Sequence, residues 1–311
     1  MSTHRSRYRR IATILEHHGL GLGLGLLGLE KWIPFNKGVL GHARRDEPYT
    51  SPEHLRLALE ELGPTFIKLG QLLSTRNDLL PAAYLAELVK LQDAAPPEAW
   101  EPMKAVIREE LGADPEQLFA QFDPQPLAAA SIGQAYAATL HDGTQVVVKV
   151  RRPGAVAQIH EDLEILQNLA ERADKRWDAA RQYNLPGIVE EFSRTLRAEL
   201  DYLQEGRNAE RFAADFADSP DVAVPQVFWE TTTSRVLTLE RMHGIRVDDL
   251  PALDAAGIDR NQLARRGADL ILTMVFENRF FHADPHPGNL FIQTDGSIAL
   301  IDFGMVGQLD E

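Results

Sequence analysis

The stretch HADPHPGNLFIQTDGSIALIDFG, residues 282–304, carries the most specific spacing in this sequence. Asp284 and Asn289 stand five positions apart in a segment rich in proline, histidine and glycine, which predicts a loop. Asp302 follows thirteen positions after Asn289, at the head of an Asp-Phe-Gly tripeptide. Carboxylate and amide oxygens are hard ligands of the kind that Mg²⁺ prefers. The sequence therefore predicts that Asn289 and Asp302 bind a magnesium ion.

A β-hairpin is predicted between the two halves of this stretch. Two short apolar runs, 290–293 and 298–301, flank Asp295-Gly296, a dipeptide typical of tight hairpin turns. Antiparallel pairing returns the end of the second run to the start of the first. The hairpin is thus a compact way to bring Asp302 back beside Asn289.

The order of these residues is the order found in protein kinases, which place a catalytic-loop Asp, a Mg²⁺-binding Asn and a Mg²⁺-binding Asp of DFG in succession. Phosphoryl transfer needs oxygen ligands for Mg²⁺ and a carboxylate that orients the attacking hydroxyl and accepts its proton. Asp284 is predicted to be that carboxylate. Taken singly, each residue is more often a turn former or a solvated carboxylate, but their joint spacing favours the kinase interpretation. His282 and His286 flank Asp284, and His282 is expected to shape the loop through hydrogen bonds rather than to bind zinc.

Lys149 is the candidate phosphate-binding cation. It lies in the apolar run 146–150 (VVVKV), where a charged side chain needs a partner or a ligand, unless it extends from a strand edge to solvent. The segment 128–134 (AAASIGQ) precedes this run, where a kinase carries a glycine-rich phosphate loop. Its single glycine is Gly133, and alanine cannot adopt the positive φ values that glycine tolerates. A stiffer loop with altered nucleotide handling is expected.

Periodicity and cap signals organise the rest of the chain. A capping-box spacing at Thr50 and Glu53 opens a mainly helical region, and Asp142-Gly143 predicts a hairpin between strand-like runs at 127–140 and 145–151. Helices are predicted over residues 51–62, 66–73, 81–92, 100–111, 155–174, 186–216 and 260–278, and further strands over 222–229 and 235–240.

Six ordered motifs resemble the UbiB family of atypical kinases. Five of them are LAAASIGQAY, VVVKV, RAELDYLQEGRNAERF, HADPHPGNLF and LIDFG, and the sixth, FIKLGQLLSTRNDLLP at 66–81, resembles the K-x-G-Q signature of that family. The similarity covers roughly residues 50–311. It implies an α+β, protein-kinase-like fold with an N-terminal helical extension, binding of ATP with Mg²⁺, and a role in ubiquinone or other isoprenoid-lipid biosynthesis. Members of the family associate with membranes, and ATPase activity is better supported for them than protein phosphorylation.

The resemblance also implies roles for single residues. Lys149 resembles the phosphate-pairing lysine, with Glu205 as its partner. Glu199 and Asp201 match the E-x-D motif, which faces the K-x-G-Q helix and places Lys68 and Gln71 over the nucleotide site. The alternatives are an ordinary exposed lysine and a solvated acidic helix face. The resemblance also places the nucleotide against the segment 128–134, here called the alanine loop. It assigns no chemistry to Asn208. The loop residues concerned are Ala128, Ala129, Ala130 and Ser131.

The amino-acid composition limits the classes of binding partner and the cellular compartment that can be expected. The formal net charge is −14, which argues against a nonspecific nucleic-acid binder. The chain contains no cysteine, which excludes disulfides and thiolate metal sites and is compatible with a reducing cytoplasm. The first 49 residues are interpreted as a leader in which a basic segment (4–10) precedes an apolar, glycine-rich one (19–29) too short to span a bilayer. They indicate either a peripheral contact with the inner face of a membrane or a frayed leader.

Three further segments are expected after the leader: a helical extension at 50–122, a kinase-like N-lobe with inserted helices at 123–242, and the start of a C-lobe at 243–311. The sequence ends seven residues past Gly304, so the C-lobe is interpreted as truncated after DFG. Apolar surface is therefore expected around 262–276 and 298–303.

Two functions from different classes remain open at this point. The first is a Mg²⁺-ATP enzyme, a kinase-like phosphotransferase or ATPase acting on water, a small molecule or a lipid. The second is a nucleotide-gated protein that binds isoprenoid lipids or quinone-biosynthesis proteins. A conventional protein Ser/Thr kinase is disfavoured by the alanine loop and by the helical extension.

Overall fold

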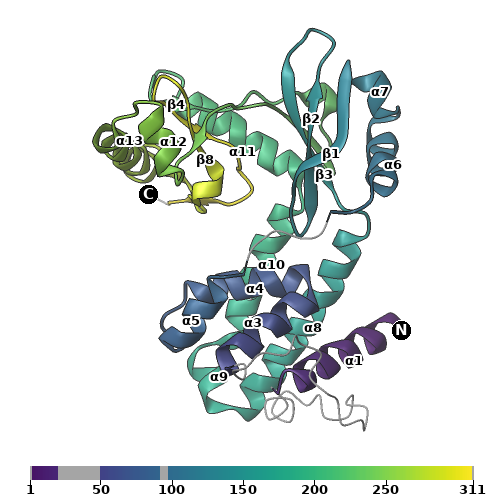
Figure 1. Cartoon of the computed structure of the whole chain (residues 1–311). Helices are drawn as coiled ribbons and strands as arrows, with labels where there is room; N and C mark the ends of the chain where they lie inside the picture. Colours follow the sequence, from purple (N-terminus) through teal and green to yellow (C-terminus); the bar gives the residue numbers. More distant parts are fainter. Residues whose placement is uncertain (1, 20–49, 92–96, 310–311) are drawn as a thin grey trace. The chain divides into compact units, whose positions relative to one another are not determined.

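The chain forms two compact units (Figure 1), and the computed structural model describes residues 2–19, 50–91 and 97–309. The first, here called the helical unit, comprises the described residues up to 91 together with 129–132 and 154–196. The second, here called the mixed unit, comprises residues 97–128, 133–153 and 197–309.

The helical unit is built from helices that pack on one another. Thr50 caps the first of its predicted helices: its Oγ1 accepts from Glu53 N at 3.4 Å, and Glu53 Oε2 accepts from Thr50 N at 2.8 Å, which confirms the capping box. The helices are α1 (Ser2–His17), α3 (Ser51–Leu62), α4 (Pro64–Ser74), α5 (Ala82–Leu88), α8 (Ala155–Arg176), α9 (Asp178–Gln182) and α10 (Leu185–Glu199).

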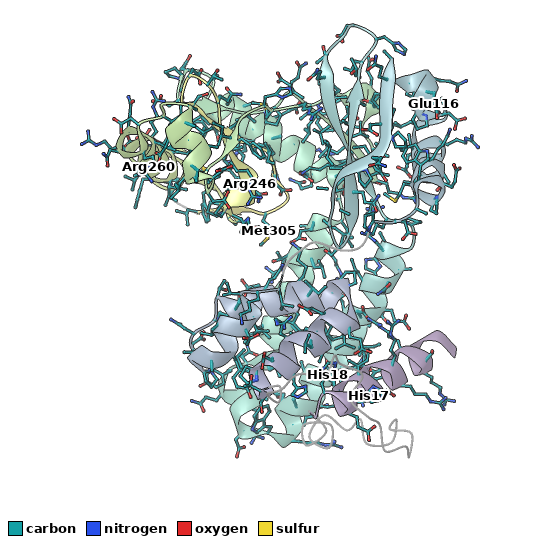
Figure 2. The ribbon with its side chains drawn as sticks, viewed as in Figure 1. His17, His18, Glu116, Arg246, Arg260 and Met305 are labelled. Atoms are coloured by element: carbon teal, nitrogen blue, oxygen red, sulfur yellow. The ribbon has the colours of Figure 1, made fainter. Side chains whose placement is uncertain are left out.

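Helix α1 belongs to the core of this unit, although its sequence was interpreted as the start of a leader. It contacts α3 and α8, and its apolar residues Ile11 and Ile14 are buried. Arg7 is only 8% exposed and forms a two-pronged ion pair with the fully buried Asp162 of α8. At the end of the helix, the Nε2 atom of His18 lies 3.1 Å from Glu61 Oε2 (Figure 2). The rest of the leader, from residue 20 to 49, lies outside the described residues.

The first sheet of the mixed unit has the strand order β1-β2-β3-β5. The predicted Asp142-Gly143 hairpin joins β2 to β3, with Gly143 at φ +92° and Asp142 Oδ1 accepting from Thr144 N at 2.8 Å. Register pairing sets Lys149 of β3 opposite Ala135 of β2 and Leu237 of β5. The strands are β1 (Gln121–Ala129), β2 (Gly133–Thr139), β3 (Gln145–Arg151) and β5 (Val236–Glu240).

Helix α6 (Trp100–Leu111) packs against this sheet, and α7 (Pro115–Leu118) follows it (Figure 1). Met103, Val106 and Ile107 of α6 share a buried cluster with Tyr136 and Val148 of the strands. As predicted, α6 ends at Leu111, and the glycine that caps it, Gly112, adopts φ +76°. The structure thus groups α6 with the sheet, whereas the sequence assigned residues 50–122 to one helical extension.

The remainder of the mixed unit forms a second sheet, of order β4-β9-β8-β6, and a two-stranded pair, β7-β10. The predicted hairpin at Asp295-Gly296 joins β8 to β9, with Gly296 at φ +81°. The elements are β4 (Val222–Ala223), β6 (Ile245–Arg246), β7 (Phe280–His282), β8 (Leu290–Ile292), β9 (Ile298–Leu300), β10 (Val306–Gln308), α11 (Tyr202–Asp215), α12 (Leu250–Ala255) and α13 (Arg260–Leu272).

Several predicted elements are shorter than expected: the helix predicted over 81–92 is confined to α5, and the strand-like run predicted over 127–140 is interrupted between β1 and β2. The strand predicted over 222–229 is confined to Val222–Ala223, with one isolated bridge from Val227 to Leu239, because Pro225 has no N–H to continue a ladder. The helix predicted over 260–278 is α-helical only to Leu272 and continues as a π-helical turn, Thr273–Glu277.

The single helix predicted over 186–216 is also wrong, because the chain breaks between α10 and α11. Asp201 has extended backbone angles (φ −108°, ψ 97°), and its Oδ1 accepts from Leu203 N at 3.0 Å. A short acidic side chain that satisfies a free backbone N–H in this way is a typical N-cap. The break makes Glu205 a residue of the first turn of α11.

The expected apolar surface is present in one of its two places. Leu272, the last residue of α13, is 52% exposed, and Phe276, in the π-helical turn that follows, is 73% exposed. The expectation for 298–303 is wrong: β9 is an inner strand of its sheet, and Phe303 is fully buried against Phe212 of α11. Among the helices in the described residues, none is both long enough and apolar enough to cross a membrane.

Candidate nucleotide and metal site

Lys149 stands between two carboxylates that come from distant parts of the sequence. Its Nζ lies 2.5 Å from Glu205 Oε1 of α11 and 2.9 Å from Asp302 Oδ2, two residues beyond β9. The Lys149 and Glu205 side chains are 17% and 7% exposed, and that of Asp302 is 40% exposed. The lysine therefore has the partners that its place in an apolar strand requires, and the expected Lys149–Glu205 pairing is present.

The charges of the three groups depend on one another. Burial alone would lower the pKa of Lys149, but Asp302 and Glu205 outweigh burial and raise it, so the ammonium stays charged. Burial would raise the pKa of Asp302, but the charge of Lys149 outweighs it and lowers that pKa to about 2. For Glu205, burial dominates and raises the pKa in spite of Lys149. Asp302 is thus ionised at neutral pH, as a carboxylate that binds a metal must be.

Residues 302–304 are held by their backbone as well as by Lys149. Gly304 N donates to Asp302 Oδ1 at 3.1 Å, and Asn208 Nδ2 donates to the carbonyl of Phe303 at 2.8 Å. Sequence reasoning missed Asn208, which is 5% exposed on α11. The sequence feature that could have identified Asn208 is its position one turn after Glu205, on the same face of the helix. A neutral amide buried on that face needs a hydrogen-bond partner.

The predicted catalytic loop is shaped by its own polar groups. Asp284 N donates to His282 Nδ1 at 3.1 Å, which confirms that His282 supports the loop by a hydrogen bond. Burial lowers the pKa of His282, which favours its neutral ring. Asn289 Nδ2 donates to the carbonyl of Asp284 at 3.3 Å, and Ile301 N donates to the carbonyl of Asn289 at 3.2 Å. The hairpin therefore returns the chain beside Asn289 one residue before Asp302, as the spacing predicted.

These residues fit the requirements of Mg²⁺. Because the Nδ2 of Asn289 is turned to the backbone of Asp284, its amide oxygen is left for a ligand. Asp302 contributes an ionised carboxylate, and both ligands are hard oxygens. In the alanine loop, Ser131 is 2% exposed, and its Oγ has no hydrogen-bond partner within the part of the chain that the structure describes. A buried hydroxyl without a hydrogen-bond partner is suited to bind a polar ligand such as a phosphate.

The remaining predicted residues have structural roles of their own. Asp201 caps α11, and Glu199 is the last residue of α10. In the helical unit, Gln71 Nε2 donates to the carbonyl of Leu91 at 3.2 Å. A Cβ on Gly70 would lie 2.2 Å from Leu91 Cδ1 and 2.8 Å from Leu59 Cδ1, so the glycine of the K-x-G-Q motif permits close packing of α4. The nucleotide contacts predicted for Lys68, Gln71, Glu199 and Asp201 stay predictions, as do those of Ala128, Ala129 and Ala130.

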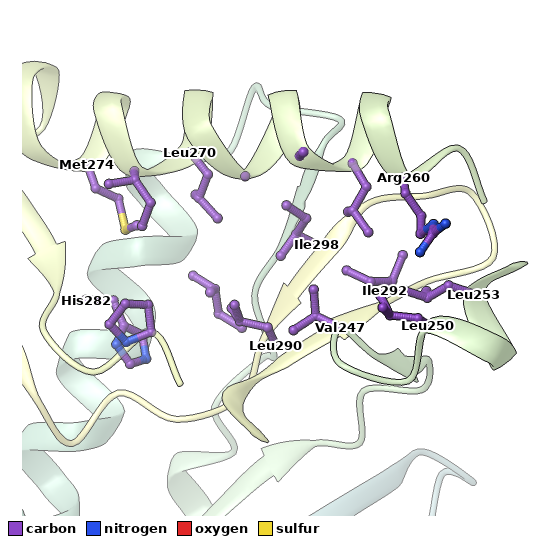
Figure 3. A pocket seen from close by; sticks show the side chains of 16 residues that line it. Val247, Leu250, Leu253, Arg260, Leu270, Met274, His282, Leu290, Ile292 and Ile298 are labelled. Carbon is purple, nitrogen blue, oxygen red and sulfur yellow. The ribbon is translucent and has the colours of Figure 1, made fainter. Parts of the chain in front are cut away.

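An apolar cavity of about 450 Å³ lies under α13 in the mixed unit (Figure 3). Leu270 of α13 and Met274 of the π-helical turn after it face Leu290, Ile292 and Ile298 of the second sheet across the cavity. A Cβ on Gly267, which also lines the cavity, would meet no atom within 4 Å. Sequence reasoning did not predict this cavity.

Comparison with known proteins supports the assignment of these motifs. Residues 90–311 match the ABC1 atypical kinase-like domain. A protein of Marinobacter nauticus named "Probable protein kinase UbiB" is 43% identical over 261 residues, which are 83% of this chain and 48% of that protein. A protein of the same name from Xylella fastidiosa is 42% identical over 309 residues, which are 97% of this chain and 56% of that protein. The chain thus spans about half the length of these relatives.

A plant protein and a protein of known structure are also similar to this chain. Arabidopsis thaliana "Protein ACTIVITY OF BC1 COMPLEX KINASE 7, chloroplastic" is 45% identical over 255 residues, 82% of this chain and 36% of that protein. The structure of Rv3197 from Mycobacterium tuberculosis, solved in complex with erythromycin, has a TM-score of 0.58 and 30% identity, and covers 80% of this chain and 63% of that one. The α+β, kinase-like fold predicted from the motifs is confirmed, and the chain belongs to the ABC1 atypical kinase-like family, which includes the UbiB proteins.

Proposed function

We propose that this protein binds ATP with Mg²⁺ at the Lys149–Glu205–Asp302 cluster, and hydrolyses the nucleotide or transfers its terminal phosphate to a small molecule or lipid. The observation that carries the proposal is the largely shielded Lys149 side chain, 17% exposed, whose ammonium lies 2.5 Å from Glu205 and 2.9 Å from Asp302. A strand lysine paired with a helix glutamate beside a DFG aspartate is the arrangement that phosphoryl transfer in kinase-like folds requires.

Each side chain has a separate task in this proposal. Lys149, oriented by Glu205, pairs with phosphate oxygens, while Asn289 and Asp302 provide the oxygen ligands for Mg²⁺. Asp284 orients the attacking hydroxyl or water and accepts its proton. Mg²⁺, when bound, neutralises charge on the phosphates. Ala128, Ala129, Ala130 and Ser131 adjoin the nucleotide, and Lys68, Gln71, Glu199 and Asp201 complete the nucleotide site.

The pathway and the location of the protein are part of the same proposal. The UbiB names of the relatives support a role in ubiquinone or related isoprenoid-lipid biosynthesis, with quinone-biosynthesis proteins as partners. Arg5, Arg9 and Arg10 of α1 are exposed, and clustered arginines suit a peripheral contact with anionic headgroups at the inner face of a membrane.

Phosphate release by the purified chain tests the catalytic proposal. Asp302→Asn is expected to reduce Mg²⁺-dependent phosphate release from ATP on the order of 100-fold, because the amide cannot bind the metal as a carboxylate does. Asp178→Asn, the same change at an exposed residue of α9 that pairs with Arg181, is the matched control and should keep the wild-type rate. Equal turnover in Asp302→Asn and wild type would show that the metal site is assigned wrongly.

A second candidate is a nucleotide-gated protein that binds an apolar molecule, and the cavity under α13 favours it. The complex of Rv3197 with erythromycin gives a relative with an organic ligand. Farnesol, a short isoprenoid alcohol, is expected to bind the wild type with an affinity that changes when ATP is added. Gly267→Phe, which would fill the cavity, should abolish this binding, whereas Ala268→Phe on the exposed side of α13 should not. Equal farnesol binding in both variants would exclude the cavity as the site.

A further inference from the structure

Helix α11 holds both backbone polar groups of Phe303 with two side chains one turn apart. Glu205 Oε1 accepts from Phe303 N at 3.5 Å, and Asn208 Nδ2 donates to Phe303 O at 2.8 Å. The second bond is the shorter of the two, and it lies between groups that are almost fully shielded, since Asn208 is 5% exposed and Phe303 is 0% exposed.

The orientation of the Asn208 amide is fixed from its other side. Gln204 Nε2 donates to Asn208 Oδ1 at 2.9 Å, so the oxygen of the amide faces Gln204 and its nitrogen faces Phe303. Gln204 itself is exposed. A relay of two amides therefore runs from the surface of α11 to the DFG backbone, and each member satisfies the next.

The carbonyl held by Asn208 is one residue from the metal ligand. Asp302 has its Oδ2 on Lys149 and its Oδ1 on Gly304 N, so the direction of its carboxylate depends on the course of the 302–304 backbone as well as on Lys149. If the Phe303 carbonyl turned away, the Asp302 carboxylate would turn with the adjoining backbone.

We propose that Asn208 is a positioning residue for Asp302: its amide keeps the 302–304 backbone in the arrangement that presents the Asp302 carboxylate to Lys149 and to Mg²⁺. This inference rests on the proposed binding of nucleotide with Mg²⁺ at this site. Asn208 touches neither nucleotide nor metal, and acts only through the backbone of Phe303.

Other contacts of α11 provide controls, because they hold the helix without touching residues 302–304. The Arg211 guanidinium lies 3.9 Å from the ring centre of Phe280, and its Nη1 lies 3.2 Å from Gln308 Oε1. Arg211→Met should therefore loosen α11 against β7 and β10 and leave the DFG backbone bonds in place.

The test compares ADP affinity in excess MgCl₂ with ADP affinity in EDTA, measured by calorimetry on the whole chain. Asn208→Leu removes both hydrogen bonds without adding charge, and is expected to reduce the Mg²⁺-linked gain in affinity about fivefold, the value of one buried hydrogen bond. Affinity in EDTA should stay at the wild-type value. A variant that merely weakened the fold would lose affinity equally in both media.

Gln204→Glu provides a second variant at an exposed position, where folding is not at risk. The introduced carboxylate accepts but cannot donate, so it favours the reversed amide of Asn208, with its oxygen toward the Phe303 carbonyl. This variant should also lose the Mg²⁺-linked gain, whereas Gln204→Met and Arg211→Met should keep it.

The outcomes separate the two levels of inference. Asn208→Leu and Gln204→Glu could both keep the wild-type ratio of ADP affinity in MgCl₂ to ADP affinity in EDTA, or could both lose ADP affinity equally in the two media. Either result would overturn the role of Asn208 and leave the proposed function standing. If the ADP affinity of the wild-type protein did not depend on Mg²⁺, both the proposed function and this inference would be overturned.

Discussion

Replacing Lys149 by methionine is expected to destabilise the mixed unit by about 3–5 kcal/mol and to weaken nucleotide binding about tenfold to hundredfold. Glu205 is 7% exposed, and without Lys149 it would remain buried with no cation beside it. Its pKa, already raised by burial, would rise further as that opposing charge is lost. Chemical unfolding followed by circular dichroism measures the first effect, and calorimetry with ADP and Mg²⁺ measures the second.

The double variant Lys149→Met/Glu205→Met separates the two effects. Removing both members of a buried pair is far less destabilising than removing one, so most of the lost stability should return. Nucleotide affinity should not return, because the phosphates still lack their cation. Asp302 adds little to the loss of stability, since at 40% exposure water can solvate its carboxylate. A double variant as unstable as the single one would show that the unpaired Glu205 is not the source of the lost stability.

Arg7→Met is expected to destabilise the helical unit by a similar amount, about 3–5 kcal/mol. The Arg7 Nε lies 2.6 Å from Asp162 Oδ1, and its Nη2 donates both to Asp162 Oδ2 and to the carbonyl of Leu62, each at 2.8 Å. Asp162 is 0% exposed, and without Arg7 the hydrogen-bond donor that remains to it among the described residues is the hydroxyl of Thr65, at 3.0 Å. Thermal unfolding followed by circular dichroism should show the loss.

Two further variants sharpen this test. Arg9→Met removes an exposed arginine from the same helix and should leave the unfolding temperature unchanged. Arg7→Met/Asp162→Asn neutralises the buried carboxylate and keeps an acceptor for Thr65, so it should recover part of the stability. If Arg7→Met behaved like Arg9→Met, helix α1 would not be fixed by this ion pair.

The part of the site that the sequence predicts best is the part built from local chemistry. Asp295-Gly296 closes a short hairpin, and the return of the chain beside Asn289 follows from antiparallel pairing alone. The pairing of Lys149 with Glu205 joins residues 56 positions apart. Spacing cannot predict such a contact, and the resemblance to UbiB proteins supplied it.

The features that the sequence did not predict depend on tertiary surroundings. The break at Asp201 lies within a helical pattern, and whether an aspartate there is a helix residue or a cap depends on what α10 and α11 pack against. Asn208 looks like any polar residue of a solvated helix until Phe303 is placed beside it. Arg7 belongs to a basic stretch typical of a surface, and only the buried Asp162, 155 positions away, explains it.

The one glycine of the alanine loop has a consequence for how this segment can change. A Cβ on Gly133 would lie 2.3 Å from the Tyr202 hydroxyl and 3.0 Å from the carbonyl of Val150. Tyr202 is the first residue of α11, and it is 5% exposed, so it has little space into which to withdraw. Replacing Gly133 by alanine would therefore displace the start of the helix that carries Glu205. Packing alone therefore opposes a larger residue at Gly133, whether or not a nucleotide binds nearby.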